Sequence, residues 1–465
     1  MMQDLRSFMA ACEKRLPNEF VRITKQVDPK YEITAVVKKV DLLGKSPMMV
    51  FEKVKGSTMS VVCNTDTDLN KFALAFGVTP DRVNDFYGEK EEEAMRLNKY
   101  PCREVGRKDA PCKEAVLTGK KASLHHFPFL IHHENEVPYL TRAVGIVTDE
   151  KNNIPHTAHY RFMVKGPYLG VTHITPGRHF WDIYNERREQ KRSLEIAFAV
   201  GLHPSVGIAT QSRVSHPPSE FDVAGSLLGE PLEMVRCETI DVLVPAHSEI
   251  VIEGEIPFNT REPEGPWGDF TRYHQVADRH PVKIKAITHR KNPIVHDMGA
   301  WPSVGGLPLV RIPAHAFMNR KIKEAVPDVK RFLFLPEAGW FYGFIQLDKK
   351  HAGQPKQAIL AAFASELYLK YVAVFDTDID IENPAQMAWA LATRVQADRD
   401  LVILPGMLGT DLDLSAPAEG VLTKVGIDAT AKPFRKDLPP VAGIPEAVMK
   451  RIDLKEYIPN IEKYL

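Results

Sequence analysis

The sequence predicts a mixed α+β fold made of three consecutive domains, at residues 1–115, 116–305 and 306–465. Helix-like and strand-like segments are mixed in the first part, short strand-like runs fill the second, and helices alternate with strands in the third. Because many short strands separated by turn signals are typical of antiparallel structures, the second domain is expected to be a closed or nearly closed β-barrel. The alternation in the third part favours an α/β layer domain.

The first domain is expected to begin with an amphipathic helix, because apolar residues recur at helical spacing between Leu5 and Leu16. Further strands are expected at residues 21–24, 48–51 and 59–63, and helices at residues 68–76 and 79–97. The polar residues 101–121 are interpreted as a connector to the second domain.

Strand-like runs follow one another at short intervals in the second domain, and one helix interrupts them at residues 180–190. The runs cover residues 141–148, 157–164, 170–174, 194–200, 206–209, 239–244, 250–256 and 282–288. The third domain is expected to hold helices at 314–325, 354–370 and 387–394, and strands at 332–336, 342–347, 371–375 and 401–404. The tail from Lys432 onward is rich in proline and then helical over residues 445–453. Because this tail is too isolated to bury its apolar side chains, we expect it to pack on a partner subunit.

Composition places the 465-residue chain among globular proteins, with 44% hydrophobic and 26% charged residues. Sixty basic residues balance 60 acidic ones, which disfavours a general nucleic-acid or membrane-surface binder. Five scattered cysteines, and no apolar run typical of a signal peptide or membrane span, favour a reducing cytoplasm without a disulfide framework. The sequence contains no GxGxxG and no Walker loop, which disfavours the usual dinucleotide and nucleotide-triphosphate sites.

The candidate chemistry centres on residues 262–269, EPEGPWGD. Two prolines fix φ in this stretch and two glycines permit backbone angles that other residues avoid. Glu264 and Asp269 are therefore expected on a stiff turn, as proton transfer requires. The commoner alternative for such a stretch is a solvated acidic hairpin tip.

Arg161 lies among apolar residues of a strand-like segment. A buried arginine needs an acidic partner, whereas one on the outer face of an edge strand needs none. Together with Glu264 and Asp269, Arg161 would form a site that grips a carboxylate and moves a proton.

Histidine is unusually dense in the second domain, and neutral imidazole is a common ligand of transition metals. These histidines include His125, His126, His132, His133, His156, His159, His173, His179, His203, His216, His247 and His274. No pair has the HExxH spacing of a helix-borne zinc site, so each one alone is more often a surface or hydrogen-bonding histidine.

Three segments of the chain, in the same order, carry the pattern of a known family. They are MMVFEKVKG (residues 48–56, with DLRSF near the start), LEMVRCETIDVLVPAHSEIVIEGEI followed by EGPWGDFTRY, and VFDTDIDIENPAQMAWALATRVQADRDL (residues 374–401). Over nearly its whole length the chain resembles the UbiD family of prenylated-FMN-dependent reversible decarboxylases. This resemblance implies an N-terminal α+β domain, a central split β-barrel that holds the flavin, and a C-terminal α/β domain.

The resemblance also implies a catalytic triad of Arg161, Glu264 and Asp269. In such a triad, Arg161 would orient the substrate carboxylate, Glu264 would hold Arg161, and Asp269 would protonate the carbon after CO₂ leaves. The metal ligands of the family, usually for Mn²⁺ and accompanied by K⁺, fall at positions resembling His156, His179 and Glu220. The first of these positions is an asparagine in the family. The residues at positions that wrap the cofactor are His159, Tyr160, Arg161, Thr210, Gln211 and Arg213, together with the three metal positions.

The leading hypothesis is a carboxy-lyase that reversibly decarboxylates an unsaturated, aromatic or heteroaromatic acid. Because no side chain stabilises the resulting carbanion well, a cofactor must accept the electrons, and the resemblance names prenylated FMN. His296, Trp301 and residues 405–415 are candidates for substrate contact. The resemblance further implies a UbiX-type flavin prenyltransferase as cofactor supplier and a homodimer or higher homo-oligomer. Two alternatives are a non-catalytic assembly subunit of a multi-subunit carboxylase and a flavin-free metal hydrolase.

Overall fold

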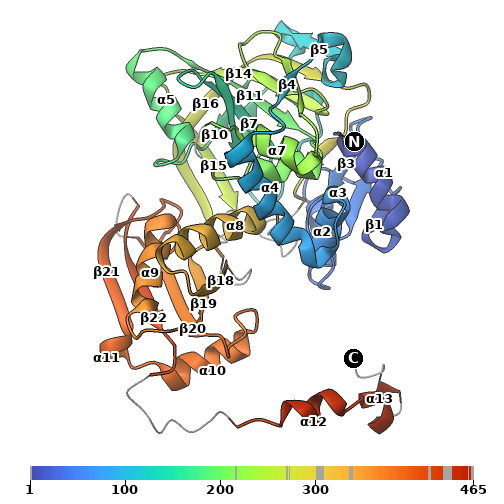
Figure 1. The fold of residues 1–465 in the computed structure, drawn as a ribbon. Helices are drawn as coiled ribbons and strands as arrows, with labels where there is room; N and C mark the ends of the chain where they lie inside the picture. Colours follow the sequence, from blue (N-terminus) through green and yellow to red (C-terminus); the bar gives the residue numbers. More distant parts are fainter. Residues whose placement is uncertain are drawn as a thin grey trace.

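The fold is mixed α and β, which confirms the predicted class, and four sheets are present in the described part of the chain (Figure 1). The computed structural model describes residues 3–214, 217–268, 271, 273–299, 308–334, 339–416, 420–432, 442–458 and 460–461. None of the helices in these residues combines the length and the apolar character needed to span a membrane.

A four-stranded sheet in the order β1-β2-β3-β17 forms the N-terminal region. Its strands are β1 (Phe20–Ile23), β2 (Met48–Phe51), β3 (Val61–Cys63) and β17 (Val295–Asp297), and the helices of this region are α1 (Leu5–Arg15), α2 (Glu32–Asp41), α3 (Leu69–Phe76) and α4 (Val83–Leu97). Strand β17 comes from far downstream and pairs in parallel with β3. Helix α2 was not predicted, because its N-cap Tyr31 offers no side-chain cap and has a φ of 69°.

The central region is built on a ten-stranded sheet in the order β6-β9-β10-β16-β14-β11-β7-β8, with β15 and β5 also paired to β16. These strands are β5 (Ala115–Thr118), β6 (Tyr139–Leu140), β7 (Val144–Asp149), β8 (Ile154–His159), β9 (Phe162–Gly166), β10 (Leu169–Thr172), β11 (Leu194–Val200), β14 (Ile250–Ile256), β15 (Glu262–Gly268) and β16 (His274–His289). The start of β16 pairs with β15 and its later residues pair with β10, β14 and β5. A small sheet, in the order β13-β12-β4, joins β4 (Arg103–Glu104), β12 (Glu233–Arg236) and β13 (Leu243–Pro245).

Two helices of the central region differ from the expectation. The strand expected at residues 206–209 is wrong, because these residues belong to helix α6 (Pro204–Ala209). Pro204 stands in the first turn of α6, and His203 caps it by accepting the backbone N–H of Ser205 at 3.2 Å. Helix α7 (Glu220–Leu228) begins with a capping box but was missed, since all of its residues are buried and no polar face marks the helical period.

Three strand boundaries are also corrected. The run at residues 157–164 is two strands, β8 and β9, with Tyr160 and Arg161 between them. The stretch expected to be a turn is largely strand β15, whose pairing with β16 shifts register between Glu264 and Trp267. The run at residues 239–244 contributes only the start of β13. In each case side-chain alternation alone did not show where pairing begins or shifts.

The C-terminal region is a five-stranded sheet in the order β18-β19-β20-β22-β21, covered by helices as predicted (Figure 1). Its elements are α8 (Pro308–Ala325), β18 (Val329–Phe334), β19 (Tyr342–Leu347), α9 (Gln354–Ser365), β20 (Tyr371–Asp376), α10 (Pro384–Arg394), α11 (Ala397–Asp400), β21 (Leu401–Leu408) and β22 (Val421–Asp428). Helices α8 and α9 contribute to one apolar cluster with the sheet and α10 to another, so the sheet is buried on both faces.

The last described segment carries two short helices, α12 (Glu446–Arg451) and α13 (Leu454–Tyr457). They extend away from the sheets in Figure 1. Exposed apolar side chains on it include Ile444, Met449, Leu454 and Tyr457. The expectation that this tail packs on a partner subunit stays a prediction. Helix α5 (His179–Glu189), in contrast, buries Phe180, Ile183 and Tyr184 in the central core.

Candidate active site

Arg161 and Glu264 form a buried ion pair in the central region. Arg161 Nε and Nη2 donate to Glu264 Oε1 and Oε2, each over 2.9 Å. Their side chains are only 12% and 1% exposed, which excludes the outer-face position considered for Arg161. The hydroxyl of Tyr139 also donates to Glu264 Oε1, at 3.1 Å. The carboxylate thus accepts three hydrogen bonds from two side chains in a site shielded from water.

The backbone of β15 fixes the position of Glu264. Gly265, in the register shift, has a φ of 114°, and a Cβ at this position would lie 2.2 Å from the carbonyl oxygen of Gln275. Only glycine fits such a backbone. Beyond the shift, the Trp267 ring packs 4.5 Å from the ring of Tyr139, centroid to centroid. Glu264 is therefore placed by a paired strand, β15, and not by the turn that was expected.

Asp269, Trp301 and His216 lie outside the described residues. The proton-donor role of Asp269 stays a prediction.

A cavity of about 530 Å³ lies between the central and C-terminal regions. The proposed cofactor residues that line it are His156, His159, Tyr160, His179, Thr210, Gln211, Arg213 and Glu220. Phe317, Trp340, Glu366 and Tyr368 line it from the C-terminal region. Arg161 does not line the cavity itself but follows directly on Tyr160.

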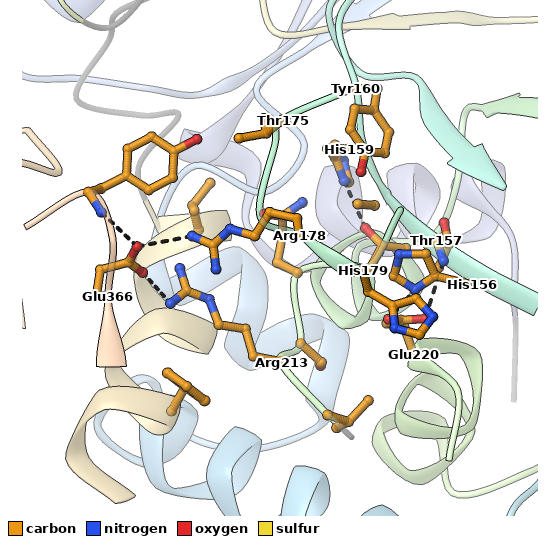
Figure 2. A pocket seen from close by; sticks show the side chains of 18 of the residues that line it. His156, Thr157, His159, Tyr160, Thr175, Arg178, His179, Arg213, Glu220 and Glu366 are labelled. Atoms are coloured by element: carbon orange, nitrogen blue, oxygen red, sulfur yellow. Dashed lines mark hydrogen bonds and ion pairs between the residues drawn. The ribbon is translucent and has the colours of Figure 1, made fainter. Parts of the chain in front are cut away.

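His156, His179 and Glu220 gather at one side of this cavity (Figure 2). His156 Nδ1 lies 2.9 Å from Glu220 Oε1, and the rings of His156 and His179 are 4.7 Å apart between centroids. His179 Nε2 lies 3.2 Å from Asp149 Oδ2. Imidazole nitrogens and a carboxylate form a reasonable donor set for a divalent transition metal. The assignment of these three residues as ligands stays a prediction.

On the other side of the cavity, Arg178 and Arg213 both point toward Glu366 (Figure 2). Arg178 Nη2 lies 3.0 Å from Glu366 Oε1, and Arg213 forms an ion pair with Oε2 of the same carboxylate. Burial acts to raise the pKa of Glu366, but Arg213 and Arg178 outweigh it and lower this pKa. The sequence did not indicate Arg178 or Glu366, because partners 188 positions apart leave no local pattern.

His159 is half-buried and His296 is buried. His159 Nδ1 lies 2.8 Å from Thr210 Oγ1, and His296 Nε2 lies 2.8 Å from Thr65 Oγ1. Burial, reinforced by the charge of Arg142, lowers the pKa of both rings well below the ordinary value. His296 lies in β17, outside the lining of the cavity. Of residues 405–415, Leu412 lines it.

Family comparisons match all three parts of the chain. Residues 12–90 match the N-terminal domain of 3-octaprenyl-4-hydroxybenzoate carboxy-lyase, residues 103–301 its Rift-related domain, and residues 308–429 its C-terminal domain. The chain belongs to the UbiD family. The resemblance deduced from three sequence segments is thereby confirmed, while the domain boundaries after residues 115 and 305 stay predictions.

Several curated relatives of this UbiD family member are decarboxylases by name. Anhydromevalonate phosphate decarboxylase of Methanothermobacter thermautotrophicus is 32% identical, over 86% of this chain and 92% of the relative. The enzyme of the same name from Methanosarcina mazei is also 32% identical, over 92% of this chain and 96% of that one. The chain is accordingly a carboxy-lyase, as predicted.

Solved structures of the UbiD class extend this likeness to the fold and the cofactor. The UbiD-class enzyme HmfF from Pelotomaculum thermopropionicum, in complex with FMN, is 36% identical with a TM-score of 0.86, over 98% of this chain and 100% of that one. An evolved dimeric form of HmfF, in complex with prenylated FMN, is 34% identical with a TM-score of 0.84 and the same coverage. Vanillic acid decarboxylase from Sedimentibacter hydroxybenzoicus, in closed form, is 26% identical with a TM-score of 0.88, over 99% of this chain and 100% of that one.

The cavity of this UbiD family member fits a flavin. Aromatic rings of Tyr160, Phe317 and Trp340 offer surfaces for a planar ring system, and Arg178 and Arg213 offer positive charge for a phosphate. The flavin expected from the sequence is supported by this lining and by the flavin-bound UbiD-class structures.

Proposed function

We propose that the chain catalyses the reversible, non-oxidative decarboxylation of an unsaturated, aromatic or heteroaromatic carboxylic acid with prenylated FMN. The observation that carries the proposal is the buried, bidentate ion pair of Arg161 and Glu264. Arg161 is the residue that directly follows Tyr160, which lines the cavity. A guanidinium fixed in this way is suited to orient a carboxylate.

Each member of the proposed triad has a separate task. Arg161 binds and orients the substrate carboxylate, and Glu264 holds the plane of the guanidinium. Asp269, which follows the last residue of β15, delivers a proton to the substrate carbon after CO₂ leaves and removes it in the reverse direction. For the forward step its carboxyl group must be protonated, which requires a pKa raised by burial.

Prenylated FMN, when bound, supplies the electron sink that decarboxylation at an sp² carbon needs. His156, His179 and Glu220 would hold Mn²⁺ near the flavin phosphate, with K⁺ close by, and Arg178 and Arg213 would add positive charge. His159, Tyr160, Thr210 and Gln211 would contact the flavin. A UbiX-type flavin prenyltransferase would supply this cofactor.

The names of the relatives indicate two classes of substrate. One relative acts on anhydromevalonate phosphate and another on vanillic acid, an aromatic acid. Because Arg178 and Arg213 already share Glu366 and would face the flavin phosphate, the described residues of the lining offer little further positive charge for a phosphorylated substrate. This charge balance favours an aromatic or heteroaromatic acid.

The proposal is tested with protein made with and without a co-expressed flavin prenyltransferase. We expect a flavin-like absorbance and the mass of prenylated FMN only with the prenyltransferase. The loaded protein should then release CO₂ from a member of a panel of aromatic and heteroaromatic acids, and Asp269→Asn should abolish this activity.

Three outcomes would change the proposal. Release of CO₂ from anhydromevalonate phosphate alone would replace the substrate class. Absence of any bound flavin under both conditions would remove the cofactor and favour a non-catalytic assembly subunit. Activity that needs zinc and no flavin would favour the metal hydrolase. The homo-oligomer is tested separately, by light scattering of the full chain and of a chain ending at residue 432.

A further inference from the structure

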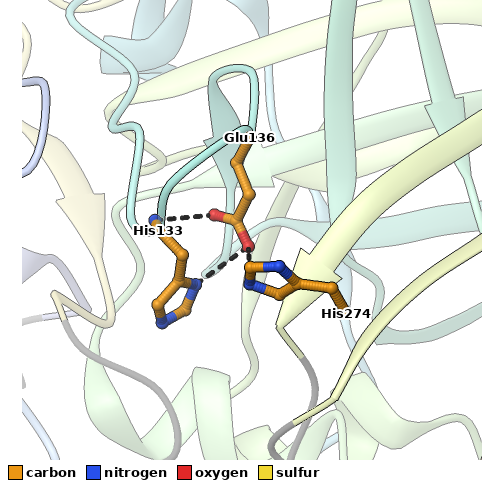
Figure 3. A group of neighbouring side chains, drawn as sticks. All are labelled: His133, Glu136 and His274. Carbon is orange, nitrogen blue, oxygen red and sulfur yellow. Dashed lines mark hydrogen bonds and ion pairs between the residues drawn. The ribbon is translucent and has the colours of Figure 1, made fainter.

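His133, Glu136 and His274 bring two imidazoles and a carboxylate together away from the flavin cavity (Figure 3). One potential ligand atom from each lies within 4.8 Å of the other two. His133 Nδ1 is 2.8 Å from Glu136 Oε1, and His274 Nε2 is 3.8 Å from the same oxygen. Within the described residues, no second group of histidine, cysteine or acidic side chains meets this spacing.

The carboxylate of Glu136 is held in place by the backbone around it. His133 and Glu136 stand at the ends of a turn in which Asn135 has a φ of 66° and Glu136 N–H donates to His133 O at 3.3 Å. His133 N–H donates to Glu136 Oε2 at 3.0 Å, and Gly268 N–H donates to Oε1 at 2.8 Å. Such hydrogen bonds to a carboxylate are typical of the surroundings of metal ligands.

The third side chain comes from a different element. His274 is the first residue of β16 and lies opposite Gly268, the last residue of β15. A Cβ on Gly268 would lie 2.9 Å from His133 Nδ1 and 3.4 Å from His274 Cδ2, so the bare glycine lets the two rings approach to 5.7 Å between centroids.

The cluster combines a buried carboxylate with two partly exposed imidazole rings. The Glu136 side chain is fully buried, whereas those of His133 and His274 are 30% and 40% exposed. An ion from solvent can therefore reach the imidazoles, and the carboxylate behind them supplies a negative charge.

We propose that His133 Nδ1, Glu136 Oε1 and His274 Nε2 bind a divalent transition-metal ion of the Zn²⁺ and Co²⁺ class. Ligand bonds of about 2.0–2.2 Å place neighbouring ligand atoms of a tetrahedral site about 3.3–3.6 Å apart. The two histidine–carboxylate separations in the structure, 2.8 and 3.8 Å, lie on either side of this range, so small side-chain rotations would complete the site. Two nitrogens and one oxygen favour these metals over Mg²⁺ and Ca²⁺. Three protein ligands leave one coordination position for water.

Such an ion would join three parts of the chain. It would tie the turn that carries Glu136 to His274, at the start of β16, beside the end of β15. The chain between these two strand ends contains Asp269. The ion would therefore fix both ends of the short segment that carries the proposed proton donor. This inference concerns a metal site separate from the proposed flavin site.

The test is a Co²⁺ titration of full-length, flavin-free protein that has first been stripped of metals. Wild-type protein should develop the visible absorption of Co²⁺ with nitrogen and oxygen ligands, and Zn²⁺ should displace the ion and remove this absorption. His274→Ala and Glu136→Gln should each weaken binding by at least about tenfold. His126→Ala, which removes an exposed histidine of the same region, should bind like wild type.

Glu220→Gln separates this site from the flavin cavity and should retain the Co²⁺ absorption. His274→Gln serves as a second variant at this position. Thermal melting and circular dichroism of all variants show whether a loss of Co²⁺ binding is due to unfolding. Identical Co²⁺ spectra and stoichiometry in wild type and in folded His274→Ala or His274→Gln protein would overturn the proposal, as would loss of the absorption only in Glu220→Gln. None of these outcomes depends on decarboxylase activity.

Discussion

Arg161 and Glu264 are 103 positions apart in the sequence, yet their side chains meet through two parallel hydrogen bonds of 2.9 Å. Arg161 lies between β8 and β9, and Glu264 lies in β15 just before the register shift. Because the pair is buried, the removal of either charge leaves the other uncompensated, and such losses are large. The pair should therefore govern both activity and stability.

Glu264→Gln should lower kcat/KM for decarboxylation by about 10²-fold or more, since the amide cannot hold the Arg161 guanidinium with two acceptor oxygens. The measurement is CO₂ release by prenylated-FMN-loaded enzyme, with bound flavin quantified in the same samples. Glu262→Gln is the matched control, because Glu262 lies in the same strand but pairs with Lys165 at the surface. A Glu264→Gln enzyme within twofold of wild type would remove the pair from the mechanism.

Tyr139→Phe should lower the free energy of unfolding by about 1–2 kcal/mol, because the buried Glu264 carboxylate loses one donor. Urea unfolding followed by circular dichroism measures the change. Tyr168→Phe provides the comparison: its hydroxyl donates to the Lys120 carbonyl on the surface, so its loss should cost less than about 0.5 kcal/mol. Equal costs for the two variants would contradict the prediction.

Gly265→Ala should destabilise the fold by more than about 2 kcal/mol, because the added methyl group collides with the carbonyl of Gln275 and the φ of 114° is strained for alanine. Gly119→Ala separates these two causes. Gly119 also has a positive φ, of 54°, but nothing lies within 4 Å of its added Cβ, so only about 1 kcal/mol is expected. Thermal melting of both variants gives the comparison, and a smaller loss for Gly265→Ala would rule out the collision.

Stability should fall on acidification from pH 6.5 to pH 4, in part because of His203. Burial lowers the pKa of His203 in the folded protein to about 4, while an unfolded histidine has a pKa of about 6.5. The unfolded chain then binds more protons between these values, so the folding stability that this histidine contributes is lost as the pH falls. The loss is on the order of 3 kcal/mol.

His203→Asn isolates this contribution, because asparagine also caps a helix N-terminus but does not titrate. Urea unfolding at pH 6.5 and pH 4.5 should show a smaller loss of stability for the variant than for wild type. The same loss in both proteins would show that other buried groups, such as His280 and His315, account for the acid sensitivity.

The sequence predicted the elements whose side chains alternate or recur regularly. The α/β pattern of the C-terminal region and most strands of the central sheet were found in this way. Helix α7 was missed because it is buried all round, and the strand expected at residues 206–209 was wrong because its apolar run belongs to a capped helix, α6. The periodicity of apolar residues shows which face of an element is exposed to solvent. It therefore cannot identify an element that is buried on all sides.

The candidate site was predicted in part for a similar reason. Arg161 and Glu264 were singled out by residue type and by the family resemblance, and the structure brings them together. Glu366 was not singled out, because its role depends on two arginines that reach it from another region. His133 and His274 were likewise noted only as two of many histidines in the second domain, and Glu136 was not noted at all, since β16 returns to that turn only in the folded chain.

Glu366 lines the cavity from the C-terminal region and forms ion pairs there with Arg178 and Arg213 of the central region. The arginine side chains are 31% and 24% exposed, so dissolved ions can reach them. Added salt screens such contacts, and the Debye length falls from about 10 Å at 0.1 M to about 3 Å at 1 M. The ion pairs between the two regions thus depend on ionic strength. The enzyme's affinity for its ligands should therefore weaken in concentrated salt even where the fold remains intact.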